Sequence, residues 1–311
     1  MLIGTRKHHY LPQGYLAAFT DTGKKDGLFY VLELDKGTWF RTSPKNVAAQ
    51  RDFNRVDIEG HSPDVIEQAF SPVEALMIEA CRRVVQTQAY PNDEDINYIL
   101  NLLGLIAVRN PKLRTSFNKA REHMMNMISH MLVSKKEIFE HQVKKAREAG
   151  YLSQQNHSSY EDVKRFVEGG EYDIEFLPEG NLRIELETFD KILSVLGERI
   201  WSVFVAPPSG PTFICSDHPV TLVWKNERID GPVGFGLKNT EVFFPLGPTV
   251  GLYGTYEQPQ NEVVELSPTN VARLNRRIMD NAEKHVFSTT GSFYIRDESN
   301  IIEVPCILER R

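Results

Sequence analysis

The sequence has few cysteines and no close pair of them. Its 311 residues include three, Cys81, Cys215 and Cys306, which lie far apart and form no C-x-x-C pair. This pattern excludes a disulfide framework and gives no structural zinc motif. We therefore expect three free thiols without a catalytic role and a reducing compartment, which indicates a cytoplasmic protein.

Long apolar runs are missing as well. No stretch reaches the roughly 18 apolar residues that a membrane-spanning helix needs, and the opening residues MLIGTRKHHYLP contain no apolar leader segment. An excess of positive charge is also absent, since the net charge is −6 and the isoelectric point is near 5.9. We expect no membrane partner and no general basic surface for nucleic acid, although a local basic groove is compatible with these values.

Several motifs that define enzyme classes do not occur. The sequence contains no P-loop, no G-x-S-x-G, no G-x-G-x-x-G and no H-E-x-x-H, which disfavours P-loop kinases, α/β-hydrolases, Rossmann proteins and zincins. His123, His130 and His141 fall in one predicted helix but do not form an i, i+4 ligand pair. The cofactor stays open, because no ligand spacing indicates a divalent metal, and the sequence carries no signal of oligomeric state.

The composition is that of a chain with a full hydrophobic core. Hydrophobic residues make up 41% of the sequence and aromatic residues 10%, and the length suits one large domain. Strand patterns near both ends flank a helical middle at about 62–168. We predict an α+β fold, with one domain over 1–311, a mixed or antiparallel sheet from both chain ends and a central helical insertion.

Apolar spacing and turn residues predict the individual elements. Hairpins are expected over 28–42 and 172–186, and further strands at 201–205, 212–215, 241–254 and after 286. Helices are expected at 93–108, 111–149, 160–168, 188–197 and 268–285. A short helix from Ser62 precedes a separate one whose N-cap is Ser71, with Pro72 at its first position and Glu74 completing a capping box. We expect Glu67 and Glu74 to be solvated or to cap helices.

The most informative stretch is 8–19, HHYLPQGYLAAF. Pro12 suits the first turn of a helix and favours an extended conformation just before it, so we expect a helix from about Pro12 that buries Tyr15, Leu16 and Phe19. His8 and His9 lie on the extended lead-in and point to opposite sides. The helix N-terminus favours a neutral imidazole, which can ligate metal or accept a proton. In the alternative interpretation, one histidine bonds a backbone carbonyl and the other is solvated.

A second polar group, Ser216-Asp217-His218-Pro219, lies between two apolar runs. It comes where a buried strand is predicted to end, a common position for site residues. Asp217 is suited to orienting a histidine, binding a cation or acting as a base. An Asx turn before Pro219 explains the same residues without any chemistry, and the two interpretations have equal weight.

The assembled motifs resemble a bacterial family known as domain of unknown function 4238, over nearly the whole chain. The family pattern is similar to HHY-x-P-x-x-Y-L-x-x-F at 8–19, R-x-P at 109–111, S-D-x-P at 216–219, P-L-x-P at 245–248 and an asparagine in the last helix, here Asn275. Similar proteins often have Asn where this chain has His218. The resemblance implies a domain assignment and a choice of residues, and it implies no mechanism.

Two functional hypotheses follow. In the first, the protein is a hydrolase that acts on a phosphodiester or nucleotide, and its substrate is a small molecule or a nucleic acid. His8 or His9 is the general base or a metal ligand, and Asp217 orients that histidine. Substrate contacts would come from Tyr10, Arg109, Ser216, His218 and Asn275, with Arg109 holding a phosphate. In the second, the same groups form a structural hydrogen-bond network in a non-catalytic module that binds a ligand or protein. We predict that His8 or His9, Arg109 and Asp217 converge on one solvent-reachable pocket, because each is a polar residue at the boundary of an apolar element.

Overall fold

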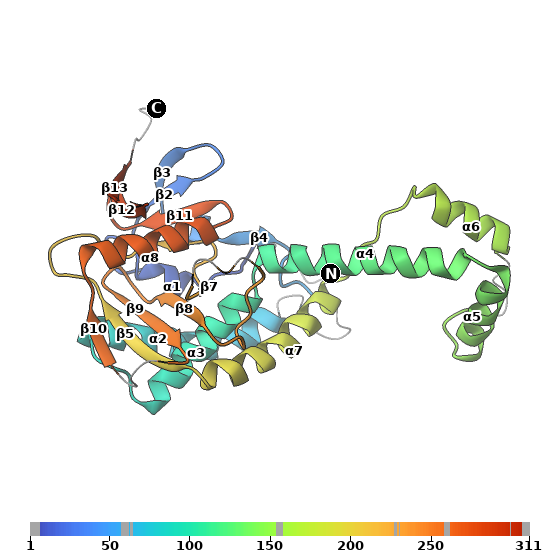
Figure 1. Ribbon diagram of the computed structural model, residues 1–311, viewed down its shortest axis with the longest axis horizontal. Helices are drawn as coiled ribbons and strands as arrows, with labels where there is room; N and C mark the ends of the chain where they lie inside the picture. Colours follow the sequence, from blue (N-terminus) through green and yellow to red (C-terminus); the bar gives the residue numbers. More distant parts are fainter. Residues whose placement is uncertain are drawn as a thin grey trace. The chain divides into compact units, whose positions relative to one another are not determined.

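The fold consists of two compact units. A computed structural model describes residues 7–56, 62, 65–153, 158–226, 229, 231–257, 262–298 and 300–306. Unit 1 contains Met1–Asn110 and Pro178–Arg311, and unit 2 contains Pro111–Leu177 (Figure 1). Strands from both chain ends and the intervening helices confirm the α+β class, while a single domain over 1–311 stays a prediction.

The larger sheet of unit 1 has five strands in the order β10-β5-β9-β8-β7. Strand β10 pairs with β5 in parallel and all the other pairs are antiparallel, so this is a mixed sheet. The strands are β5 (Ile200–Val205), β7 (Thr221–Trp224), β8 (Thr240–Pro245), β9 (Val250–Thr255) and β10 (Glu262–Glu265).

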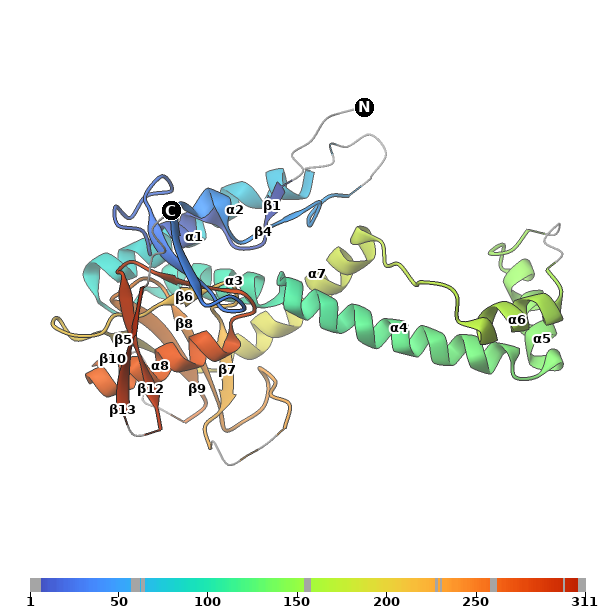
Figure 2. The same ribbon diagram turned by 90° about the horizontal axis from the view of Figure 1, so that it is seen from above.

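The second sheet of unit 1 joins the two ends of the chain. Its order is β3-β2-β11-β6, with β2 (Phe29–Glu33), β3 (Thr38–Thr42), β6 (Cys215–Ser216) and β11 (His285–Ser288). The N-terminal hairpin β2-β3 is confirmed, and β2 pairs antiparallel with the C-terminal β11 (Figure 1). Figure 2 shows the blue N-terminal segment beside the red C-terminal one. Two smaller pairs are β1 (Lys7–His9) with β4 (Ala49–Arg51), and β12 (Ser292–Asp297) with β13 (Asn300–Pro305).

The core of unit 1 lies on both faces of the five-stranded sheet. Alternate residues of a strand point to opposite faces: on β8, Val242 and Phe244 join one buried cluster, whereas Phe243 joins the other. Helices α2 (Val65–Thr87) and α3 (Asp93–Val108) cover the first face and α8 (Pro268–Asn281) covers the second (Figure 1). The sheet is therefore sandwiched between helices, which explains why its strands are apolar on both sides.

The N-terminal motif folds as its residues predict. Pro12 precedes the short helix α1 (Gln13–Ala17), and Tyr15, Leu16 and Phe19 are buried. The chain then passes through the 3-10 helix η1 (Pro44–Asn46) before β4. Helix α3 also matches its expected position, with Asn92 as its N-cap. Helix α8 begins at Pro268 as expected, with Ser267 as its N-cap, but it ends at Asn281 instead of continuing to His285, which starts β11.

Unit 2 contains α4 (Pro111–Val133), α5 (Lys136–Glu148) and α6 (Tyr160–Gly169). The prediction of one helix over 111–149 is wrong. The Ser134 side chain and backbone N–H both bond the Met131 carbonyl, and Lys135 is extended with φ −141° and ψ 138°. These bonds replace the helical ones and divide the segment in two.

Three further expectations are corrected. The helix does not begin at Ser71, because α2 starts at Val65 and continues through Pro72; the proline removes one hydrogen bond of the helix, and burial of Met77, Ala80 and Val84 on its apolar face offsets that cost. The hairpin over 172–186 is replaced by helix α7 (Pro178–Gly197). In place of a strand over 212–215 there is the short β6.

The reason for the α7 correction is a choice between two periodicities. The alternation at 182–186 extends to apolar residues spaced by three and four, Leu182, Leu186, Phe189, Leu193 and Leu196, which is helical spacing. Pro178 then lies at the first helical position, where it is favoured, instead of in a turn. Among the described helices, none is long and apolar enough to cross a membrane.

Candidate functional site

The two histidines of the N-terminal motif have different environments. Strand β1 alternates, so the side chain of His8 is fully buried while that of His9 is half-buried. The Asn54 backbone N–H donates to His8 Nδ1 at 2.8 Å. This bond uses His8 to hold the chain after β4, whereas the buried Nδ1 of His9 has no hydrogen-bond partner among the described residues.

His9 lines a pocket that also contains Arg109. We call it the His9–Arg109 pocket; its cavity volume is about 310 Å³ and it is lined by His9, Pro12, Gln13, Gly14, Lys25, Glu67, Ser71, Glu74, Ala75, Ile78 and Arg109. The residues come from β1, α1, the loop after α1, α2 and the end of α3. This size is at the lower end of the range for small-molecule sites.

Arg109 follows the last residue of α3 and is buried, with only 5% of its surface exposed. Its Nη1 donates to Glu74 Oε1 at 3.4 Å, and its guanidinium lies over the Phe70 ring at 4.9 Å. Its Nε is buried and has no partner among the described residues. Because a buried donor without a partner is costly, this atom is suited to meeting a ligand.

The titratable groups of the pocket are shifted by burial. Burial lowers the pKa of His9 below 6.5, and Lys7 lowers it further, while hydrogen bonds of the His9 ring with the backbone of Val47 and Ala48 oppose the shift. Burial raises the pKa of Glu74; Arg109 opposes this shift and Glu67 adds to it. At neutral pH His9 is therefore neutral and has a lone pair that can accept a proton.

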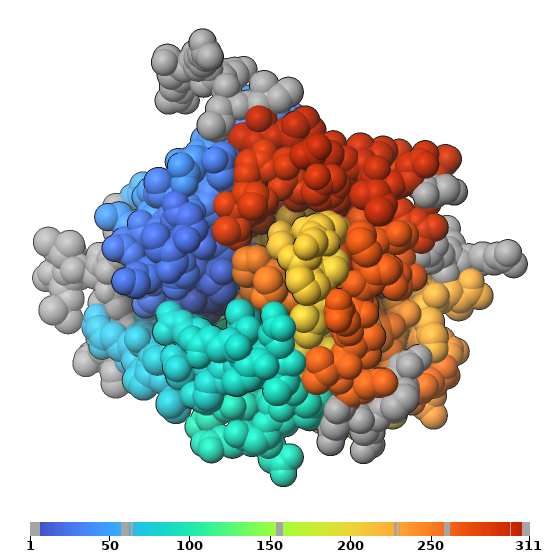
Figure 3. All heavy atoms as spheres, turned by 90° about the vertical axis from the view of Figure 1, so that its left-hand side faces the viewer, coloured from blue at the N-terminus to red at the C-terminus, as the bar shows by residue number. Residues whose placement is uncertain are grey.

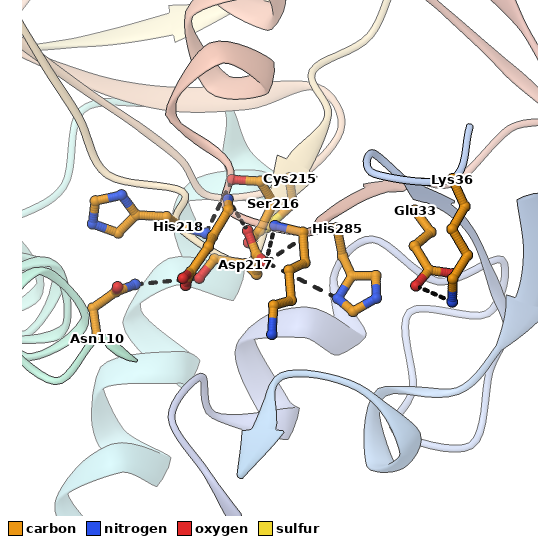
Figure 4. Close-up of polar contacts among 10 residues, drawn as sticks. Glu33, Lys36, Asn110, Cys215, Ser216, Asp217, His218 and His285 are labelled. Atoms are coloured by element: carbon orange, nitrogen blue, oxygen red, sulfur yellow. Dashed lines mark hydrogen bonds and ion pairs between the residues drawn. The ribbon is translucent and has the colours of Figure 1, made fainter. Parts of the chain in front are cut away.

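Asp217 does not line the His9–Arg109 pocket, so this pocket does not show the predicted convergence of Asp217 with His9 and Arg109. Its carboxylate accepts three backbone N–H bonds at the start of β11: Oδ1 from Glu283 at 2.9 Å, and Oδ2 from Lys284 at 2.7 Å and from His285 at 3.0 Å. The ring next to it is that of His285, whose Nδ1 is 4.0 Å from Oδ2 (Figure 4). The carboxylate thus anchors the turn between α8 and β11.

The neighbours of Asp217 have similar structural bonds. Ser216 is fully buried and its Oγ accepts the His218 backbone N–H at 3.2 Å. The Asn281 side chain donates to the His218 and Val220 carbonyls, and His218 Nδ1 lies 3.4 Å from the Asn281 carbonyl. These contacts tie the end of α8 to the segment between β6 and β7.

Asn275 on α8 is also fully buried and fully used. Its Nδ2 donates to the Thr212 and Tyr294 carbonyls at 2.9 and 3.0 Å, and its Oδ1 accepts the Ile214 backbone N–H at 3.1 Å. The asparagine therefore links α8 to the segment just before β6 and to strand β12. Its role is structural.

The separate motifs meet in the interior of unit 1. The Tyr15 hydroxyl donates to the Pro245 carbonyl at 2.7 Å, which joins the N-terminal motif to the P-L-G-P segment. The Asn110 side chain donates to the Asp217 carbonyl at 3.3 Å, which joins the end of α3 to the S-D-H-P segment (Figure 4). Motifs that are 107 and 230 residues apart are thus parts of one folded assembly.

Comparison with known proteins supplies the family. The model of the family described as "Protein of unknown function (DUF4238)" matches residues 7–292, almost the whole chain. The chain belongs to this family. No curated protein and no solved structure matches it.

In this DUF4238 chain the predicted site residues fall into two groups. The fold brings His9 and Arg109 to one pocket, whereas His8, Ser216, Asp217 and Asn275 bond the backbone elsewhere in unit 1. Tyr10 is half-buried; burial raises the pKa of its phenol, and the charges of Asp217 and Glu283 add to this shift. Tyr10 therefore lies within electrostatic reach of the Asp217 group.

Sequence reasoning missed the carboxylates of this pocket. Glu67 and Glu74 are seven residues apart, two helical turns, and so they share a face only if one helix runs through Pro72. Placing a helix start at Ser71 hid this spacing. Among the described residues, no group of three or more metal-ligating side chains is placed to hold an ion, so the cofactor stays open.

The cysteines of this family member fit the expectation of free thiols. Cys81 and Cys215 are buried and Cys306 is partly buried, and all three are unpaired. Burial raises the pKa of Cys81 and of Cys215 to about 12. Both thiols are therefore protonated at neutral pH and are poor nucleophiles.

Proposed function

We propose that the His9–Arg109 pocket binds a small anionic substrate and hydrolyses a phosphodiester or nucleotide, with His9 as the general base. The observation that supports this most directly is the pair of buried, unpartnered polar atoms on two residues of one pocket, His9 Nδ1 and Arg109 Nε. In the tautomer that carries its proton on Nε2, His9 Nδ1 is an acceptor, and Arg109 Nε is a donor. A water and a phosphate oxygen would supply the missing partners.

In this reaction each pocket residue has one task. His9 takes a proton from water as the water oxygen bonds to phosphorus, and the bond from phosphorus to the leaving oxygen breaks. Arg109, with Lys25 at the same pocket, neutralises the phosphate oxygens. Glu74, whose pKa burial raises, supplies the proton that the leaving oxygen needs. The products are a phosphate monoester, or free phosphate, and an alcohol.

A non-catalytic role is the second candidate, and the Asp217 group favours it. Six backbone groups bond the side chains of Asp217 and Asn275, which is a structural network and not a set of waiting catalytic groups. In this candidate the pocket binds a ligand without changing it. The sequence suggested that Asp217 orients His8 or His9. In the fold, the histidine that Asp217 would orient is His285.

The test is hydrolysis of aryl phosphate mono- and diesters and of a nucleotide panel by the purified chain, compared with His9→Gln. The proposal expects turnover that His9→Gln reduces by about 10²-fold or more, the usual effect of removing a general base. The matched control is His141→Gln, which changes an exposed histidine of unit 2 and should leave the rate unchanged. Equal rates for wild type and His9→Gln would refute His9 as the base, and binding without turnover would favour the second candidate.

The cytoplasmic location and the absence of a membrane partner also stay predictions. The unpaired, buried thiols of Cys81 and Cys215 support a reducing compartment. A small-molecule substrate is favoured over nucleic acid, because the pocket is small and contains two acidic residues, Glu67 and Glu74, beside its basic ones.

A further inference from the structure

We propose that a second, adjoining cavity binds the apolar part of the same substrate, so that the preferred ligand carries an aromatic ring, such as a nucleobase, as well as a phosphate. This inference rests on the proposed function, because it assigns the non-reacting part of that substrate. It concerns α1 and α2, which contact each other. Figure 3 shows the blue N-terminal segment next to the cyan helical segment.

The second cavity, which we call the Tyr15–Val85 cavity, has a volume of about 280 Å³. Its walls are mainly apolar, and Arg82 and Gln86, at the mouth, are exposed. The lining residues are Gly14, Tyr15, Ala18, Thr22, Gly23, Ile78, Cys81, Arg82, Val85, Gln86 and Leu246. A cavity with apolar walls and a polar rim suits a flat ring whose edge carries polar atoms.

The two cavities share a wall. Gly14 and Ile78 line both of them, so a ligand that extends across this wall reaches the charged groups at one end and the apolar walls at the other. Gly14 is buried on α1, and a Cβ at this position would lie 2.6 Å from Ile78 Cδ1. The absence of a side chain therefore allows Gly14 and Ile78 to pack closely as the wall that the two cavities share, a role for Gly14 that backbone conformation does not require, since its φ is not positive.

The distribution of charge distinguishes the two ends. Lys25, Glu67, Glu74 and Arg109 all belong to the His9–Arg109 pocket, whereas the Tyr15–Val85 cavity has Arg82 as its one charged lining residue among those described. Arg82 is itself paired with Glu79 at 3.3 Å. A phosphate thus has its partners in the first pocket and an uncharged ring has its space in the second.

The experiment compares two probes that differ only in the ring. Adenosine monophosphate and ribose 5-phosphate are titrated by calorimetry into the full chain and into Ala18→Leu, whose longer side chain fills the Tyr15–Val85 cavity. We expect wild type to bind the nucleotide at least about tenfold more tightly than the sugar phosphate, since burying a ring removes apolar surface from water. Ala18→Leu should lose this tenfold difference and keep its affinity for ribose 5-phosphate.

The controls separate the inference from the proposed function. Ala89→Leu, an exposed position outside both cavities, should behave as wild type, and Val85→Phe fills the same cavity if Ala18→Leu does not fold. Equal affinity of wild type for the two probes, or a tenfold preference that survives both filling variants, overturns the second cavity while leaving the phosphate site intact. Binding of neither probe overturns the proposed function and the inference together.

Discussion

His8 and His9 are neighbours in the chain, yet their rings have opposite functions in the fold. Alternation along β1 directs His8 into the core, where it accepts the Asn54 N–H, and leaves His9 at the pocket with an unused Nδ1. The sequence predicts that the two point to opposite sides, because this follows from strand geometry. Which one accepts the Asn54 N–H depends on the return of the chain at Asn54, 46 residues later, and no local pattern contains it.

At Asp217, we expect replacement by asparagine to destabilise the fold. The amide retains one acceptor oxygen and places an NH₂ group against backbone N–H donors, so Asp217→Asn should lower the free energy of unfolding by about 1–3 kcal/mol. Denaturant unfolding measures this value. The control is Asp280→Asn at the exposed pair with Arg276, where a change within about 0.5 kcal/mol is expected. An Asp217→Asn variant with an unchanged free energy of unfolding would contradict the anchoring role.

His9 makes stability depend on pH. Its folded-state pKa is lowered below 6.5 by burial and by Lys7, so the unfolded chain binds more protons and stability rises with pH between the folded pKa and 6.5. Raising the pH from about 5 to about 7 should therefore increase the free energy of unfolding of wild type more than that of His9→Gln. A shift in the opposite direction, or none, would show that His9 is not desolvated.

Among the elements, those with long apolar repeats are predictable and those decided by distant contacts are not. Helix α3 is found at its expected residues, because its apolar spacing, the Asn92 cap and Pro111 all agree. The segment 172–186 contains both a strand-like alternation and helical spacing. Its helical form is selected by packing against α3, where Gly104 lies against Phe189 and Leu193. The sequence alone does not show that these residues pack together.

Two glycines test the elements in which they lie. Gly37 closes the β2-β3 hairpin with φ +64°, so Gly37→Ala should destabilise the fold by about 1 kcal/mol through a strained left-handed residue.

Gly197 ends α7 without positive φ, and a Cβ added at this position would meet open space. Gly197→Ala should therefore leave the stability unchanged or raise it by up to about 1 kcal/mol. Thermal melts of the two variants should move in opposite directions or differ clearly in size. Equal destabilisation would contradict the helical assignment of α7.

For the molecule as a whole, the strand-helix-strand order predicts that both chain ends build one structure. The pairing of β2 with β11, and of β11 with β6, confirms it. The division into two units was not predicted, because α4, α5 and α6 have the same amphipathic signals as the helices of unit 1. Amphipathic spacing identifies a helix and does not say which core it joins.

This shared sheet gives a prediction for a nicked chain. A protease site placed in the non-helical segment 171–177 should allow cleavage into two fragments that stay together in gel filtration, since the N-terminal fragment supplies β2 and the C-terminal fragment supplies β11. The uncleaved protein is the control for elution volume. Separation of the C-terminal fragment as an independently folded species would contradict the common sheet.

The division of labour between the adjacent histidines is the central claim, and one paired measurement tests it most directly. His8→Ala and His9→Ala are each unfolded with denaturant and each titrated with ribose 5-phosphate. We predict that His8→Ala loses about 1–3 kcal/mol of stability and keeps its affinity as long as it is folded, because it strands a buried N–H. His9→Ala should keep its stability and lose phosphate binding. Unchanged affinity in His9→Ala, or lost affinity in a His8→Ala variant of unchanged stability, would contradict the account.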